Sequence, residues 1–229
     1  MEVVYLDKPF KIQSFPLDKI YVLDNWATYE IMYNMRRVTS RTIWAQNNQV
    51  NRNGKIRHLF WGATFYEGKD KKIRDHTYHE QDTYLIRYLD WKLQTEFGFR
   101  WEDFQYAGMN GQTTGLQGTV HEDSSPENKT NISFLWYNTE YWEDDWGGPL
   151  KFYNEEAKQI DGYKEEFKKY QIAQVDYKPN RLLMFDGSIP HNADAPSDKC
   201  EYACRQSLVI RGDACRLENE LDYYANNRI

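Results

Sequence analysis

The sequence predicts a mainly β fold with flanking helices, arranged as a double-stranded β-helix, or jelly roll. Two observations carry this prediction. From about residue 101, short apolar runs alternate with turn residues, at 132–137, 150–153, 172–177, 181–185 and 206–210. Several short strands at this spacing are typical of a sandwich or barrel. Before residue 100, the apolar positions instead follow a helical spacing in two segments.

The helical segments lie near 25–37, with apolar Ile31, Met32 and Met35, and near 80–97. The intervening stretch 56–66 is more typical of a strand. No linker or repeat divides the chain, so we expect one domain. Its expected parts are an N-terminal support at 1–100, a β core at 101–212 and a C-terminal tail at 213–229.

The composition excludes some classes of protein. The chain has 229 residues, of which 40% are hydrophobic, enough for a sizeable core, and its net charge of -6 argues against a non-specific nucleic-acid binder. No apolar run reaches about 18 residues, so no membrane-spanning helix is expected. The N-terminal residues lack the features of a signal peptide, and the three cysteines are expected to be reduced thiols, so a cytoplasmic location is expected.

Two histidines stand in contexts that suggest metal chemistry. His121 and Asp123 follow a glycine-rich stretch, and at strand spacing they face the same side while Glu122 faces away. His191 follows the expected strand 181–185, and a barrel can bring it beside the first pair. Two histidines and one carboxylate leave three coordination positions open, which is the facial arrangement of non-haem Fe(II) oxygenases.

The open positions suit 2-oxoglutarate and O2, and the far carboxylate of 2-oxoglutarate then needs a fixed cation. Arg205 supplies a two-pronged donor, and Ser207 shares its strand face. Arg211 has the same strand parity and is the alternative anchor. Arg205 falls 14 positions after His191, and we interpret 197–204 as a loop insertion between them.

With these motifs in order, the segment 106–211 resembles the catalytic domain of the prolyl 4-hydroxylase-like 2-oxoglutarate/Fe(II) oxygenase superfamily, which shares its jelly roll with cupin-like proteins. The matching elements are His121-Glu-Asp123, Trp136-Tyr137-Asn138, Gly147-Gly148-Pro149-Leu150, Arg181–Phe185, Pro190-His191 and Arg205-Gln-Ser207. The resemblance implies that His121, Asp123 and His191 bind iron and that Arg205 completes the catalytic set. It also places Tyr106, Asn110, Gln112 and Trp136 near the cosubstrate, which Ser207 would contact as well.

The resemblance further implies a reaction and its partners. Oxidative decarboxylation of 2-oxoglutarate to succinate and CO2 would accompany hydroxylation of a peptide or small-molecule substrate by O2, with peptidyl proline as the leading candidate. Ascorbate is a further cofactor that the family suggests. The small size is similar to that of bacterial or phage members, so we expect the cytoplasm of a bacterial or phage-infected host cell, with no nucleic-acid or membrane partner.

Two alternative functions stay open. A cupin-like metal enzyme without 2-oxoglutarate would not need Arg205, and a non-catalytic jelly-roll binding module would not need the three ligands together.

The loop 141–146 is acidic and aromatic, and we hypothesise that it closes over the primary substrate. A second cluster at 75–80, with His76 and His79, is expected to begin a helix rather than to bind metal.

Overall fold

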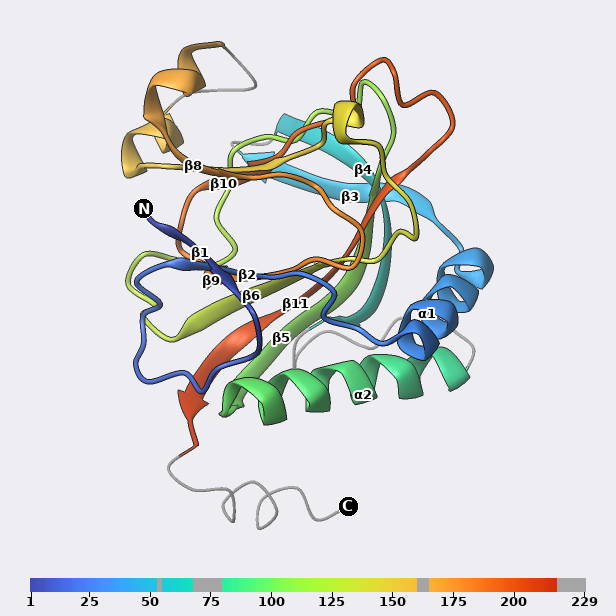
Figure 1. Cartoon of the computed structure of the whole chain (residues 1–229). Helices are drawn as coiled ribbons and strands as arrows, with labels where there is room; N and C mark the ends of the chain where they lie inside the picture. Colours follow the sequence, from blue (N-terminus) through green and yellow to red (C-terminus); the bar gives the residue numbers. More distant parts are fainter. Residues whose placement is uncertain (53–54, 68–79, 160–164, 218–229) are drawn as a thin grey trace.

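The computed structural model describes residues 1–52, 55–67, 80–159 and 165–217, which form two β-sheets and two α-helices (Figure 1). Within these residues, the large sheet has the strand order β1-β2-β9-β6-β11-β5-β4-β3, and the small sheet has the order β10-β7-β8. The strands of the large sheet, in that order, are Val3–Leu6, Ile20–Leu23, Leu182–Asp186, Asn131–Tyr137, Arg205–Arg216, Phe99–Gln112, Lys55–Glu67 and Ala45–Arg52. Those of the small sheet are His191–Ala193, Leu150–Tyr153 and Gln171–Val175.

The two sheets face each other as the layers of a sandwich (Figure 1). Strand β11 lies at the centre of the large sheet and pairs antiparallel with both β5 and β6. Apolar side chains from both sheets meet between the layers, including Leu135 and Val209 from the large sheet and Phe152 and Val175 from the small one. This arrangement confirms the predicted double-stranded β-helix.

Two helices, α1 (Tyr29–Arg41) and α2 (Glu80–Phe97), cover the opposite face of the large sheet (Figure 1). Met35 of α1 and Leu89 of α2 are fully buried there against Phe134 and Ile210 of the sheet. Burial of this apolar face stabilises the helices more than their own propensity does, since short helices are marginal in water. The helices therefore cover the outer face of the large sheet. Its inner face looks toward the small sheet, and the candidate site lies between the two.

The helices begin and end at residues with suitable local chemistry. The Thr28 side chain accepts a hydrogen bond from the backbone of Ile31 and caps α1, so the helix begins later than the expected residue 25. Helix α2 matches the expected segment and ends at Gly98, whose φ of 66° is the left-handed conformation that favours glycine.

The expected strands are confirmed, although β11, expected at 206–210, spans Arg205–Arg216 and continues past the boundary at 212. The 14-residue strand β5, which enters the glycine-rich stretch, was not among the expected strands. Gly108 within β5 leaves room for a neighbour, because a Cβ there would lie 2.2 Å from the Tyr106 hydroxyl. The Tyr106 ring therefore lies along β5 over Gly108.

Other expectations have separate outcomes. Cys200, Cys204 and Cys215 are all free thiols, as expected. No helix among the described residues is long and apolar enough to cross a membrane. The cluster with His76 and His79 lies in 68–79, outside the described residues, as does most of the expected tail after residue 217.

Candidate metal and cosubstrate site

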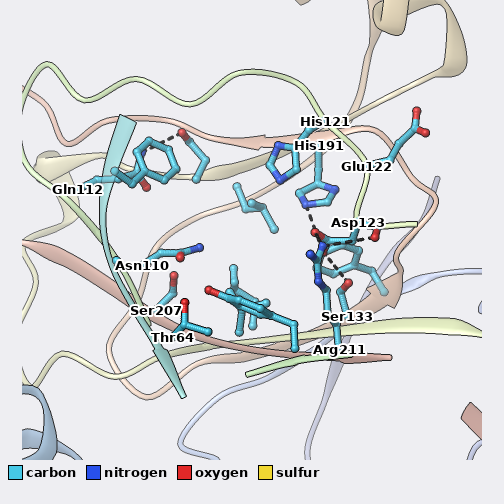
Figure 2. Close-up of a pocket in the computed structure, with 18 of the residues that line it drawn as sticks. Thr64, Asn110, Gln112, His121, Glu122, Asp123, Ser133, His191, Ser207 and Arg211 are labelled. Atoms are coloured by element: carbon cyan, nitrogen blue, oxygen red, sulfur yellow. Dashed lines mark hydrogen bonds and ion pairs between the residues drawn. The ribbon is translucent and has the colours of Figure 1, made fainter. Parts of the chain in front are cut away.

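A cavity of about 380 Å³ lies between the two sheets (Figure 2). Strands β4, β5, β6, β9 and β11 supply most of its wall, and β7 and the segments that carry His121 and His191 supply the rest. Along β11, every second residue from Arg205 to Arg211 faces the cavity, as the alternation of a strand requires.

Backbone pairing fixes the two histidines opposite each other. The backbone N–H of His121 donates to the carbonyl of His191 at 3.0 Å, and the N–H of His191 donates back to the carbonyl of His121 at 2.9 Å. The N–H of Asp123 donates to the carbonyl of Gly187 at 2.8 Å. Asp123 lies in a bend rather than in a strand, so this contact, and not the expected strand parity, turns its side chain toward the histidines.

The side chains of His121, Asp123 and His191 converge at one end of the cavity, while Glu122 points away (Figure 2). One ligand atom from each of the three lies within 4.8 Å of the others. Each imidazole has its Nδ1 beside a backbone carbonyl, that of Thr119 at 2.9 Å and that of Ile189 at 2.8 Å. Such a contact holds the proton on Nδ1 and leaves the Nε2 lone pair for a metal ion.

Asp123 is oriented and charged by its neighbours. Its Oδ2 accepts a hydrogen bond from Ser133 at 2.6 Å and lies 3.7 Å from Nε2 of His191, while Oδ1 pairs with Arg211. Burial acts to raise the pKa of Asp123, but Arg211 and the two histidines, His191 and His121, outweigh it and hold this pKa below its usual range. The carboxyl group is therefore ionised at neutral pH, as a metal ligand must be.

The other end of the cavity is formed around Arg205, which is only 1% exposed. Its Nε donates to the carbonyl of Gly148 at 2.7 Å, and its Nη1 donates to Oε1 of Gln112 at 3.0 Å. The guanidinium also lies 5.0 Å from the ring centres of Tyr137 and Tyr177. No carboxylate among the described residues pairs with Arg205, and a buried charge without a counter-charge is costly.

Ser207 is a second buried polar group at this end. It is 1% exposed, and its Oγ has no hydrogen-bond partner among the described residues. Ser207 lies two residues from Arg205 on the same face of β11 and, with Asn110, points into the cavity (Figure 2). A buried cation without a counter-charge and a buried hydroxyl without a hydrogen-bond partner together make a suitable site for a carboxylate.

The expected cosubstrate residues have different fates. Tyr106, Asn110, Gln112 and Ser207 all line the cavity. Trp136 does not, which corrects the prediction: its indole N–H donates to Asn180, and its ring packs in the helix-side core.

Tyr137, the next residue along β6, faces the space between the two sheets. The sequence analysis did not identify it as a neighbour of Arg205. Its hydroxyl lies 3.4 Å from Nη2 of Arg205. Burial raises the pKa of Tyr137, so its phenol keeps a proton that can be donated. All seven residues of β6 are buried, so its sequence carries no hydrophobic alternation that tells one face from the other.

The loop 141–146 does not behave as the hypothesised lid. Trp142 is 8% exposed, its ring lies 4.4 Å from Tyr177, and its indole N–H donates to the carbonyl of Gly147. The inserted loop covers this segment, with Lys199 paired to Asp145. Trp142 is thus part of the packing behind Arg205, and none of 141–146 lines the cavity.

The fold and the site together define a jelly-roll protein whose cavity holds a His-Asp-His group that could bind a metal ion and, at its other end, a buried arginine without a carboxylate partner among the described residues. Residues 104–209 match the family model of the 2OG-Fe(II) oxygenase superfamily. This match places the segment 104–209 in the 2OG-Fe(II) oxygenase superfamily.

Solved structures share the fold. A prolyl hydroxylase from Trichoplax adhaerens, in complex with a hypoxia inducible factor oxygen degradation domain peptide fragment, is 18% identical, with a TM-score of 0.52 over 85% of this chain and 83% of that one. A Pseudomonas putida prolyl-4-hydroxylase is 14% identical, with a TM-score of 0.52 over 85% and 92%. The α-ketoglutarate-dependent epimerase SnoN from nogalamycin biosynthesis is 10% identical, with a TM-score of 0.53 over 86% and 80%. The search of curated proteins found no match.

The family implies Fe(II) and 2-oxoglutarate, and the donor set fits the metal. Two neutral imidazoles and one carboxylate are the ligands that non-haem Fe(II) takes in this family of sites. The buried Arg205 and Ser207 supply what a carboxylate of the cosubstrate needs, at a distance from the three ligands.

Proposed function

We propose that this protein uses Fe(II), 2-oxoglutarate and O2 to hydroxylate an organic substrate, with release of succinate and CO2. The observation that carries the proposal is that one cavity contains both a convergent set of possible metal ligands and a buried cation without a counter-charge. At one end, His121, Asp123 and His191 converge with their ligand atoms turned inward. At the other, Arg205 is buried without a carboxylate partner among the described residues, beside the unpartnered Ser207 hydroxyl.

In this proposal, His121, Asp123 and His191 hold the iron, which supplies the activation of O2. Ser133 and the backbone carbonyls behind the two histidines keep the ligands in place before the metal arrives. A site organised in this way loses little free energy on reorganisation when the metal and substrates bind.

Arg205 and Ser207 form the proposed anchor for the far carboxylate of 2-oxoglutarate. Arg205 already uses Nε and Nη1 for Gly148 and Gln112, so its guanidinium is held in one orientation. The Ser207 hydroxyl adds a neutral donor, and the Tyr137 hydroxyl supports the guanidinium at 3.4 Å from its Nη2. Gln112 and Tyr106 line the same cavity and complete the proposed cosubstrate set.

The substrate is the finer part of the proposal. Peptidyl proline is the candidate that the family suggests, because two structural neighbours are prolyl hydroxylases and one holds a peptide. SnoN, an epimerase with the same fold, shows that the fold does not determine the outcome of the reaction. Ascorbate is proposed only as a reductant that would keep the iron in the Fe(II) state.

The test is consumption of 2-oxoglutarate without added substrate, measured as succinate formed in air. Wild-type protein should form succinate only with Fe(II) and 2-oxoglutarate both present, and His191→Ala should not. A protein that binds metal but neither binds nor consumes 2-oxoglutarate would instead be a cupin-like metal enzyme. One that binds neither would be a binding module.

A further inference from the structure

The turn between β9 and β10 contacts both segments that carry the proposed metal ligands. A backbone hydrogen bond of 3.1 Å closes the turn at 186–189, and His191 follows it directly. Within the turn, the carbonyl of Gly187 accepts hydrogen bonds from the backbone N–H groups of Asp123 at 2.8 Å and Ser124 at 3.1 Å. The turn therefore leads into one proposed ligand and holds the backbone of another.

Asp123 depends on this contact, whereas the two histidines have a contact of their own. His121 and His191 bond to each other through two backbone hydrogen bonds. Asp123 lies in a bend outside that pairing, and its N–H donates to the carbonyl of Gly187. A shift of this carbonyl should therefore move the carboxylate of Asp123 and leave the two imidazoles beside each other.

A buried amide lies directly behind Gly187. The N–H of Gly187 donates to the backbone carbonyl of Asn131 at 3.3 Å, and a Cβ on Gly187 would lie only 2.1 Å from Oδ1 of Asn131. Asn131 is 0% exposed, and its Nδ2 donates to Oε1 of Gln105 at 3.2 Å and to Oδ1 of Asp213 at 2.8 Å. Because β5 and β11 both hold this amide, it has little freedom to turn aside for a larger residue.

Glycine is needed at position 187 for space and not for its backbone conformation. The φ of Gly187 lies outside the left-handed region, so alanine there would not suffer the strain of that region. The same added Cβ would lie 3.2 Å from Oγ of Ser133, whose hydroxyl donates to Oδ2 of Asp123 (Figure 2). A residue larger than glycine would therefore press on the Asn131 amide and on the hydroxyl that orients Asp123.

We propose, building on the function proposed above, that Gly187 is a positioning residue for the metal site. Its carbonyl sets the place of Asp123, and its lack of a side chain lets Asn131 support the turn from behind. Groups that orient a metal ligand are commonly worth ~10–100-fold in metal affinity. This role differs from general support of the fold, because it acts on the carboxylate and not on the two histidines.

Two metal ions with different ligand preferences separate these two roles. Mn(II) favours oxygen ligands, whereas Ni(II) is well bound by imidazole. Gly187→Ala should therefore weaken Mn(II) binding at least ~10-fold and weaken Ni(II) binding clearly less. Calorimetry on the full chain, without 2-oxoglutarate, measures both affinities. Ser188→Ala, a change in the same turn, is the matched control and should keep both affinities.

A double variant tests the contact with Asn131. Asn131→Ala removes the amide on which the new Cβ would press, so Gly187→Ala/Asn131→Ala should regain most of the lost Mn(II) affinity. Asn131→Ala alone should lower the Tm, because Gln105 and Asp213 lose a buried donor, and should keep most of the Mn(II) affinity. Two substitutions that act independently would instead add their losses. Recovery of metal affinity by a destabilising substitution is a result that a merely structural role would not give.

The outcomes distinguish the inference from the function on which it rests. Unchanged Mn(II) binding in Gly187→Ala, or equal weakening of Mn(II) and Ni(II), would overturn the inference, as would a double variant without recovery. If Gly187→Ala does not fold, the double variant decides: it should fold and bind Mn(II) like Asn131→Ala, and failure in either respect would overturn the inference. In these cases, Mn(II) binding and succinate formation by the wild type would leave the proposed function standing. A wild type that binds neither metal would remove both.

Discussion

Arg205 and Arg211 face the same cavity from one strand, yet only Arg211 has a carboxylate partner among the described residues. They are six positions apart in the sequence, so their Cα atoms are about 20 Å apart along β11. Arg211 pairs with Asp123, a proposed metal ligand, whereas Arg205 lies at the far end beside Ser207 and Tyr137. The two arginines were alternatives for one role in the sequence, and the structure gives them different surroundings.

The first prediction tests these two roles. Arg205→Ala should weaken 2-oxoglutarate binding by at least ~30-fold, since loss of a buried charge-assisted pair costs ~2–5 kcal/mol and about 1.4 kcal/mol is tenfold. The 2-oxoglutarate affinity of Arg205→Lys should lie between those of the wild type and Arg205→Ala, because lysine keeps the charge but loses the two-pronged geometry. Arg211→Gln should mainly weaken metal binding through Asp123. Calorimetry on Mn(II)-loaded protein measures the first effect, and a larger loss of 2-oxoglutarate affinity in Arg211→Gln would reverse the assignment.

The second prediction concerns the metal ligands. Mn(II) at 100 times its Kd should stabilise the wild type by ~2.7 kcal/mol, which raises Tm by roughly 5–10 °C for a domain of this size. His121→Ala and His191→Ala should abolish this rise, because each removes one ligand. Glu122→Gln is the matched control, since its carboxylate lies between the ligands in sequence but points away from them (Figure 2). Loss of the rise in this control would show that the ligand set is wrong.

The convergent His-Asp-His group was predictable from the sequence, whereas other parts of the cavity lining were not. His121, Asp123 and His191 are identified by residue type and order, and only their convergence needed the fold. Trp136 and Tyr137 could not be told apart, because β6 is buried on both faces. The position of Glu67 in the cavity wall was not predictable from the sequence. It depends on a β-bulge in β4 between Thr64 and Tyr66, and no local sequence pattern indicates that bulge.

The lid hypothesis failed for a related reason. An acidic segment with three aromatic residues is compatible both with a mobile loop and with a packed one, and its sequence does not distinguish them. The structure buries Trp142 against Tyr177, which in turn lies against Arg205. The insertion at 197–204 then packs over this segment, a long-range contact that strand periodicity does not report.

The third prediction concerns stability and pH at Asp90 of α2. Burial raises the pKa of Asp90 to about 6, although Trp101 and Gln94 both donate hydrogen bonds to it. The folded state therefore holds this proton more tightly than the unfolded state, so stability falls as pH rises from about 4 to about 6. Asp90→Asn should remove this loss and stabilise the protein at pH 7 by about 2–3 kcal/mol, at 1.36 kcal/mol per unit of pKa.

Thermal unfolding of wild type and Asp90→Asn between pH 4 and pH 8 measures this effect. The stabilisation should be small near pH 4, where both states carry the proton, and should reach its full size above pH 6. Asp198→Asn, at an exposed position, is the control and should show no such growth with pH. A constant difference between Asp90→Asn and wild type would mean that hydrogen bonding, and not ionisation, determines the effect.

The last prediction uses two glycines to isolate the support of Arg205. Gly148 has a φ of 75°, and a Cβ there would lie 3.0 Å from Cδ of Arg205, whose Nε donates to the Gly148 carbonyl. Gly115 has a φ of 85°, but a Cβ there would meet nothing within 4 Å. Alanine at either position should cost about 1–2 kcal/mol of backbone strain. Only alanine at Gly148 should also displace the guanidinium.

Gly148→Ala should therefore weaken 2-oxoglutarate binding about tenfold or more, since a displacement of Arg205 that costs ~1.4 kcal/mol has this effect. Gly115→Ala should lose similar stability and keep its 2-oxoglutarate affinity. Calorimetry gives the affinities, and thermal unfolding gives the stabilities of the same two variants. Mn(II) binding should be nearly equal in both, because His121 and His191 lie at the other end of the cavity. Equal loss of 2-oxoglutarate affinity in the two variants would mean that general destabilisation, and not the contact with Arg205, controls the anchor.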